Sequence, residues 1–232
     1  MNGQKRLISP RVIAQLLIFI VIIPFLPLLI SGHWGWWEAW VFGALNVFIF
    51  AISRVLAARR NPDLIAERAQ YMQQENIVSW DKLLAVLLTI ATILFMLVAG
   101  LDELLDWSPP YSLPLKIISL IVILLGYVLS TYAFIENRFF SGTVRIQAER
   151  GHQVVSSGPY KWIRHPGYAG GLLTYLVAPL LLDSYWTFLP IGFLVILVIT
   201  RTYLEDRYLQ GALDGYREYA KQVRYRLLPG VW

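Results

Sequence analysis

The sequence predicts an all-α integral membrane protein with about six transmembrane segments. Hydrophobic residues make up 57% of the 232 residues and charged residues only 15%, whereas soluble domains carry roughly 25% charged residues. The apolar residues form long blocks rather than amphipathic stripes, which is typical of membrane helices. The chain has no cysteine and three histidines, which excludes disulfides and a cysteine nucleophile and argues against a metal-binding cluster.

The predicted segments run over residues 12–30, 37–56, 83–101, 115–135, 168–182 and 186–200. The first is too long for the apolar core of a cleavable signal peptide, and its two prolines predict a kink. The second begins inside a cluster of tryptophans, which is typical of a membrane interface; the cluster comprises Trp34, Trp36, Trp37 and Trp40. The first four segments form an N-terminal membrane region, residues 1–135, and residues 136–232 form a second region.

The last two segments are short. About 15 residues of helix span only ~22 Å, less than the ~30 Å of a bilayer core. Because only Asp183, Ser184 and Tyr185 separate them, we expect a tight antiparallel hairpin that either stops short or extends into flanking residues.

The charges predict an orientation. All of the 20 basic residues except Lys116 fall on one side of a six-helix arrangement. The positive-inside rule then places both termini in the cytoplasm. The polar loop 136–167 and the tail 201–232 lie on this side and flank the hairpin, so we expect them to form a pocket at the cytoplasmic face.

Individual polar residues in this region allow two interpretations. Pro166 predicts a helix start beside His165, which either caps that helix or faces a ligand held by its free N–H groups. Arg201 and Glu205 share a helix face and either form an interfacial salt bridge or line the pocket. We assign Lys161 and Arg164 to lipid phosphates. The spacing of Tyr216, Tyr219, Val223 and Leu227 predicts a tail helix that lies on the bilayer and could close one wall of the site.

Together these motifs resemble a known family. The stretch GHQVVSSGPYKWIRHPGY, the short hairpin, the Arg201–Glu205 pair and the sequence GYREY resemble the isoprenylcysteine carboxyl methyltransferases and their prokaryotic relatives, over about residues 147–229. The resemblance implies an integral membrane enzyme in a bacterial or archaeal plasma membrane. It also implies that S-adenosylmethionine is the cofactor and that residues 136–232 form the catalytic region.

The resemblance also implies roles for individual residues. Arg201 is the implied substrate-binding residue, and Arg201 and Glu205 form the implied catalytic pair. The implied cofactor-binding residues are Gln147, His152, Gln153, Val154, Val155, Tyr160, His165, Pro166, Gly167, Tyr168 and Glu205.

The sequence leaves several chemical classes of methyl acceptor open. A carboxylate of a prenylcysteine-like or isoprenoid substrate is ionised at pH 7 and needs no general base, and Arg201 could hold it through two hydrogen bonds. A phospholipid amine would need Glu205 or His165 as base.

Other functions stay open as well. A sterol-type reductase could bind the 2′-phosphate of NADPH through basic residues, namely Arg150, Lys161 and Arg164. A non-catalytic scaffold is the third alternative. The expected partners are a lipophilic or prenylated substrate and membrane lipid, without nucleic acid.

Overall fold

The computed structural model describes residues 17–69 and 77–232, and these residues are mostly helical. A single parallel bridge, between Ile163 and Tyr225, is the strand-like pairing in this part of the chain. The α-helices are α2 (Leu26–Ser31), α3 (Trp37–Arg60), α4 (Pro62–Ala69), α5 (Ser79–Leu105), α6 (Leu113–Glu136), α7 (Pro166–Leu181), α8 (Phe188–Ala212) and α9 (Tyr216–Gln222).

Four of these helices, α3, α5, α6 and α8, are long and apolar enough to cross a membrane. The protein is therefore an integral membrane protein, with an all-α fold. Of the two expected outcomes for the hairpin, α8 follows the second, because it extends past Thr200 to Ala212, whereas α7 has only 16 residues. The predicted segment 12–30 begins outside the described residues, and its described part changes from π-helix to 3-10 helix to α-helix around Pro24 and Pro27. The number six stays a prediction.

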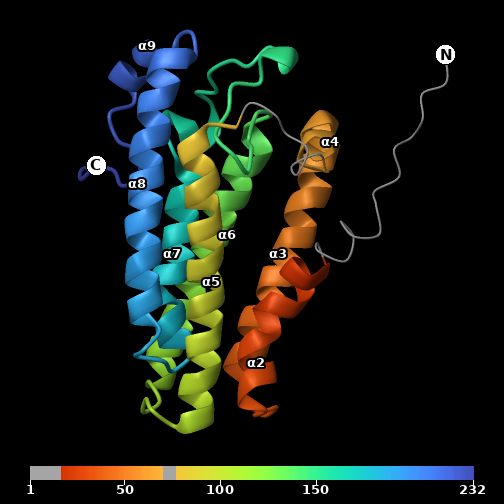
Figure 1. Cartoon of the computed structure of the whole chain (residues 1–232), viewed down its shortest axis with the longest axis vertical. Coiled ribbons are helices and arrows are strands. Elements are labelled where there is room, and N and C mark those ends of the chain that lie inside the picture. The colour runs from red at the N-terminus through yellow and green to blue at the C-terminus, as the bar shows by residue number, and fades with distance from the viewer. Residues whose placement is uncertain (1–16, 70–76) are drawn as a thin grey trace, which may run out of the picture.

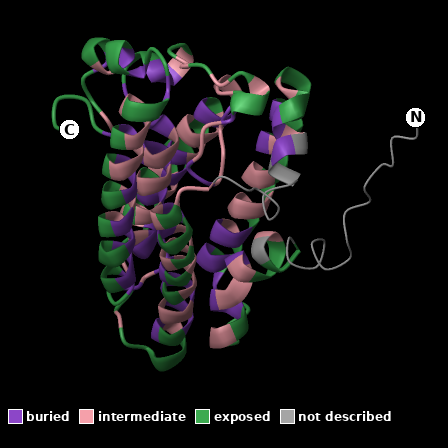
Figure 2. Cartoon of the chain, turned by 45° about the horizontal axis from the view of Figure 1, so that its top comes forward, coloured by how far each residue is buried: buried purple, intermediate pink, exposed green. Residues whose placement is uncertain are grey.

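Helices α5, α6, α7 and α8 form a bundle, and α3 leans away from it on one side (Figure 1). Short α2 packs against α5 at the lower end of the view. Exposed positions run along the outer faces of the helices (Figure 2), and many carry large apolar side chains such as Ile118, Val128 and Ile196, as a lipid-facing surface requires. Trp36, which we assigned to the interface, is 3% exposed and packs in the core.

Buried ion pairs hold the end of the bundle farthest from the polar loop. Lys116, the exception in the charge pattern, contacts the carboxylates of Glu38 and Asp183. Buried Asp102 accepts hydrogen bonds from Ser108 and Ser184. Lys116 is thus paired within the protein, and it connects α6 to α3 and to the α7–α8 loop.

At the opposite end, the tail does not form the helix that its spacing predicts. Helix α9 ends at Gln222, and Val223 and Leu227 follow in non-helical backbone. These two side chains, together with Tyr216 and Tyr219, are nevertheless buried. The tail therefore packs on the protein, and its contact with a bilayer stays a prediction.

Candidate functional site

A pocket lies between the loop after α6, the start of α7, the end of α8 and α9. Nine of the residues that the family resemblance implies line it: His152, Gln153, Val154, Val155, Tyr160, His165, Gly167, Tyr168 and Glu205. Its other walls include Asn137, Phe139, Phe140, Leu209, Leu213, Tyr216 and Tyr219. The structure does not bring Gln147, Pro166 or Arg201 into this pocket.

The start of α7 is fixed from both sides. Pro166 occupies the first turn, where its missing N–H is not needed, and His165 is the N-cap residue. The backbone N–H groups of Arg164 and His165 donate to the carbonyl oxygens of Tyr225 and Arg226, both at 2.9 Å. The extended tail therefore acts as a short partner strand that sets the entry angle of α7.

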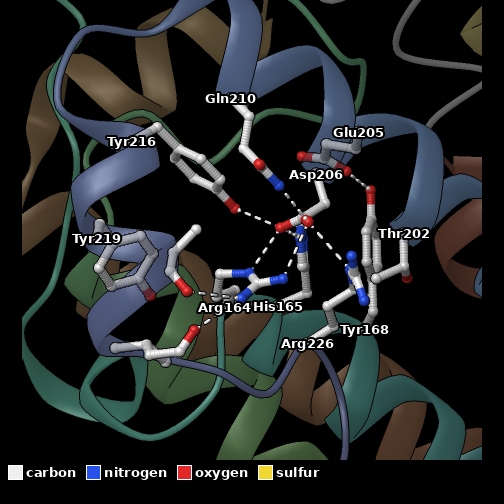
Figure 3. Close-up of polar contacts among 12 residues, drawn as sticks. Arg164, His165, Tyr168, Thr202, Glu205, Asp206, Gln210, Tyr216, Tyr219 and Arg226 are labelled. Atoms are coloured by element: carbon white, nitrogen blue, oxygen red, sulfur yellow. Dashed lines mark hydrogen bonds and ion pairs between the residues drawn. The ribbon is translucent and has the colours of Figure 1, made fainter. Parts of the chain in front are cut away.

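Asp206 lies at the centre of the site (Figure 3). Its carboxylate is fully buried and accepts hydrogen bonds from Arg164 Nε at 2.6 Å and Nη2 at 2.9 Å. It also accepts from Gln210 at 2.9 Å, Arg226 at 3.0 Å and Tyr216 at 3.1 Å. Five charge-assisted bonds in a buried environment make this carboxylate the main link between α7, α8, α9 and the tail.

The assignment of Arg164 to lipid phosphate was therefore wrong. The residue is 6% exposed, and its Nη1 donates to the carbonyl oxygens of Val223 and Arg224 at 2.7 and 3.1 Å. Buried charges need such partners to offset their desolvation. Lys161, in contrast, is exposed.

One edge of the pocket combines an aromatic pair with a carboxylate. The rings of His165 and Tyr168 stack at 5.7 Å with an angle of 8° between them. The Tyr168 hydroxyl donates to Glu205 at 2.6 Å, and Glu205 points toward it in Figure 3. His165 Nε2 is buried and lacks a hydrogen bond within the described residues, 3.5 Å from Asp206. A buried polar atom without a partner is costly, so this nitrogen is suited to receive a ligand.

The opposite wall holds neutral side chains. Burial raises the pKa of the Tyr160 phenol, and its hydroxyl contacts the Ala133 carbonyl at 3.3 Å. Burial, helped by the charges of Arg145 and Arg150, lowers the pKa of His152 to about 4. Both groups are therefore uncharged at pH 7. Gln147 lies behind this wall, where its amide donates to the Phe139 carbonyl at 2.7 Å; its predicted contact with a cofactor stays a prediction.

Arg201 faces a second cavity of about 400 Å³. This groove, which we call the apolar groove, is lined by Ile23, Pro24, Asn46, Ala85, Leu88, Thr89, Thr92, Ile93, Met96, Gly142, Tyr175 and Arg201. The Arg201 guanidinium donates to Asp81 at 2.7 and 3.0 Å and lies 5.6 Å from the Tyr168 ring. No hydrogen bond joins it to Glu205 in the described structure. The backbone of residues 141–144 separates the groove from the pocket, since Gly142 lines one and Thr143 the other.

Sequence reasoning missed Asp206 and Asp81. Asp206 follows Glu205 directly, and an acidic residue at the end of a membrane helix is costly unless it has a partner. The same rule applies to Asp81 in the first turn of α5. The acids themselves were visible in the sequence, but their partners Arg164 and Arg201 are distant along the chain.

Comparisons with known proteins find a family model that matches part of the chain. Residues 118–211 match the model of the isoprenylcysteine carboxyl methyltransferase (ICMT) family. The chain is 28% identical to a probable protein-S-isoprenylcysteine O-methyltransferase of Oryza sativa subsp. indica over 141 residues, which are 59% of this chain and 66% of that protein.

Two further relatives match over smaller shares of their length. The uncharacterized protein YpbQ of Bacillus subtilis (strain 168) is 41% identical over 61 residues, 26% of this chain and 36% of that protein. The Delta(14)-sterol reductase TM7SF2 of Mus musculus is 28% identical over 141 residues, 56% of this chain and 34% of that protein. The matches thus span between about a third and two thirds of the relatives. The family match begins in α6 and ends in α8, so it includes the pocket residues from Asn137 to Leu209, and this part of the chain is similar to the isoprenylcysteine carboxyl methyltransferase family.

Proposed function

We propose that the protein is a membrane methyltransferase that moves a methyl group from S-adenosylmethionine to a lipophilic acceptor, most simply the carboxylate of a prenylcysteine-like or isoprenoid molecule. One observation carries the proposal. The pocket of family residues and the apolar groove lie on two sides of the same short segment, residues 141–144. A water-soluble cofactor and a lipid-borne acceptor can thus approach one point from different sides.

The pocket residues fit the cofactor in their chemistry. Glu205 offers a carboxylate for the ribose hydroxyls or the amino group, and His165 Nε2, which lacks a hydrogen bond in the described residues, offers a further polar contact. The rings of Tyr160 and Tyr168 offer faces for the adenine or for the positive sulfonium. The enclosed space is only about 110 Å³, below the roughly 300–1,000 Å³ of small-molecule pockets. Binding therefore requires the walls to move apart.

Bound in this way, S-adenosylmethionine would supply an electrophilic methyl group. The acceptor oxygen forms a bond to the methyl carbon while the carbon–sulfur bond breaks, and its electron pair stays on sulfur. A carboxylate needs no proton transfer in this reaction. The protein's task is then to orient the two partners and to exclude water, for which the buried aromatic walls of the pocket are suited.

The groove supports a lipophilic acceptor. Its side chains from Ile23, Leu88, Ile93 and Met96 are apolar, and Arg201 is its charged residue. Neutral polar side chains complete the lining, namely Asn46, Thr89, Thr92 and Tyr175. A hydrocarbon chain in the groove would place a head group near Arg201. The orientation with both termini in the cytoplasm is part of this proposal: the site then faces the cytoplasm, on the side of the basic residues.

A reductase is the second candidate, because the sterol reductase is among the relatives. The basic cluster expected for a 2′-phosphate is not assembled, since Asp206 holds Arg164 and Asp63 binds Arg150 at 2.7 Å. This arrangement favours the methyltransferase.

The test is a transfer screen with purified protein, labelled S-adenosylmethionine, prenylcysteine analogues, isoprenoid acids and phospholipid extracts. We expect label in the carboxylate acceptors, lost in Glu205→Gln and retained in Glu218→Gln, an exposed position on α9. Label in phospholipid amines alone would exclude the carboxylate. Absence of transfer to every acceptor, together with oxidation of NADPH, would replace the proposal by the reductase.

A further inference from the structure

Asp81 connects three parts of the fold. It lies in the first turn of α5 and is fully buried. Its Oδ1 accepts from Arg201 Nε at 2.7 Å, and its Oδ2 accepts from Arg201 Nη2 at 3.0 Å and from the Val144 N–H at 2.7 Å. One carboxylate therefore holds both α8 and the segment 141–144.

Asp81 and Arg201 both hold the segment 141–144. Arg201 Nη2 also donates to the Gly142 carbonyl at 2.7 Å. The Val78 N–H donates to the Val144 carbonyl at 3.2 Å, so the start of α5 pairs with the segment in both directions. The partition between pocket and groove thus depends on the Asp81–Arg201 pair.

The pair also sets which edge of Arg201 is available. Nε and Nη2 make the hydrogen bonds of this guanidinium within the described residues, and Arg201 lines the apolar groove. The Nη1 amino group is left for a ligand. An acceptor can therefore reach one nitrogen, rather than the two-nitrogen edge that we expected to hold a carboxylate.

We propose that Asp81 is a positioning residue of the transfer site: it takes the Nε–Nη2 edge of Arg201 and presents Nη1 to a single oxygen of the acceptor head group. The inference rests on the proposed methyl transfer and adds how its acceptor is selected. Asp81 also offsets the buried positive charge of Arg201. The site therefore favours small head groups whose reacting oxygen carries a negative charge.

A double-mutant cycle in kcat/KM for the acceptor tests this role. The variants are Asp81→Asn, Arg201→Gln and the double variant, with Glu218→Gln as the exposed control. Because Asp81 acts through Arg201, we expect Asp81→Asn to lower kcat/KM roughly 100-fold in the wild-type background. In the Arg201→Gln background we expect it to lower kcat/KM by less than roughly threefold. Asp81→Glu keeps the charge and should recover part of the loss.

A purely structural role, through the Val144 N–H, would lower kcat/KM equally in both backgrounds. Equal effects would overturn the inference. If Asp81→Asn does not fold, as judged by S-adenosylhomocysteine binding, the cycle is run with Asp81→Glu and read by the same criterion. If the wild type is active and the effects of the Asp81 and Arg201 substitutions are additive, only the positioning role is overturned. If the wild type shows no methyl transfer, the proposed function is overturned as well.

Discussion

The contact between α6 and α7 makes a specific prediction about two adjacent glycines. A Cβ atom at Gly170 would lie 2.4 Å from the Gly126 carbonyl oxygen and 2.7 Å from the Ser130 amide nitrogen, both backbone atoms. Ordinary contact begins near 3.4 Å, so Gly170→Ala requires the helices to separate by about 1 Å. A Cβ atom at Gly171 would meet nothing within 4 Å.

The two substitutions should change stability in opposite directions. Overpacking costs about 1–3 kcal/mol, and alanine recovers about 1 kcal/mol of helix propensity, so we expect Gly170→Ala to destabilise the protein by about 1–2 kcal/mol. Separation would also weaken the bond from Ser130 Oγ to the Gly167 carbonyl, 3.1 Å in the structure. Gly171→Ala keeps only the gain, up to about 1 kcal/mol.

The same shift should affect transfer, because α7 carries His165 and Tyr168 at its start. A displacement of about 1 Å can reduce a rate roughly 100-fold. Thermal unfolding in detergent, followed by tryptophan fluorescence, measures stability, and single-turnover transfer measures the site. The reasoning is refuted if the two alanine variants unfold at the same temperature, or if Gly170→Ala is as stable and active as wild type.

Three further predictions concern charged groups. Asp206→Ala should destabilise the protein by about 3–5 kcal/mol, because it leaves the buried Arg164 without its carboxylate; an unchanged unfolding temperature would contradict this. His152 has its pKa lowered to about 4, so the unfolded chain binds the proton first, and stability should fall as the pH drops from about 6.5 to 4. Its partial exposure reduces the size of this effect, and unfolding curves at pH 7 and 5 should converge in His152→Gln. Lys116→Met should destabilise by about 3 kcal/mol yet leave cofactor affinity unchanged, since Lys116 lies at the other end of the bundle; a loss of affinity would show coupling that the structure does not contain.

The helices that the sequence predicts best are those whose signal is local. The segments 37–56, 83–101 and 115–135 lie within α3, α5 and α6, because continuous apolar runs of this length have few other stable conformations. The α7–α8 hairpin was also expected. The end of α8 was left open, because Glu205 and Asp206 are polar residues whose place in a helix depends on partners elsewhere.

The errors concern long-range pairing. The tail was predicted as one helix, but Tyr225 and Arg226 accept hydrogen bonds from Arg164 and His165 and are therefore extended. Arg164 was assigned to lipid because its partner, Asp206, is distant in the sequence. Spacing rules describe neighbours on one helix, and they contain no information on such contacts.

For the site residues, too, the sequence predicted the grouping of motifs but not the contacts between residues distant in the chain. The resemblance grouped His165, Tyr168 and Glu205, and the structure brings these three side chains together around one pocket. It could not show that Arg201 lines a different cavity, because Arg201 and Glu205 share a helix face. The difference arises from Asp81, which draws the guanidinium toward α5.

Equilibrium binding of S-adenosylhomocysteine and of NADPH to the purified protein, in wild type and in Glu205→Gln, tests the central claim most directly. We predict saturable binding of S-adenosylhomocysteine to wild type, at least roughly tenfold weaker in Glu205→Gln through loss of a charged hydrogen bond, with no binding of NADPH. The unfolding temperature of the variant should stay close to that of wild type. Equal affinity of both proteins for S-adenosylhomocysteine, or preferential binding of NADPH, would contradict the assignment of this pocket.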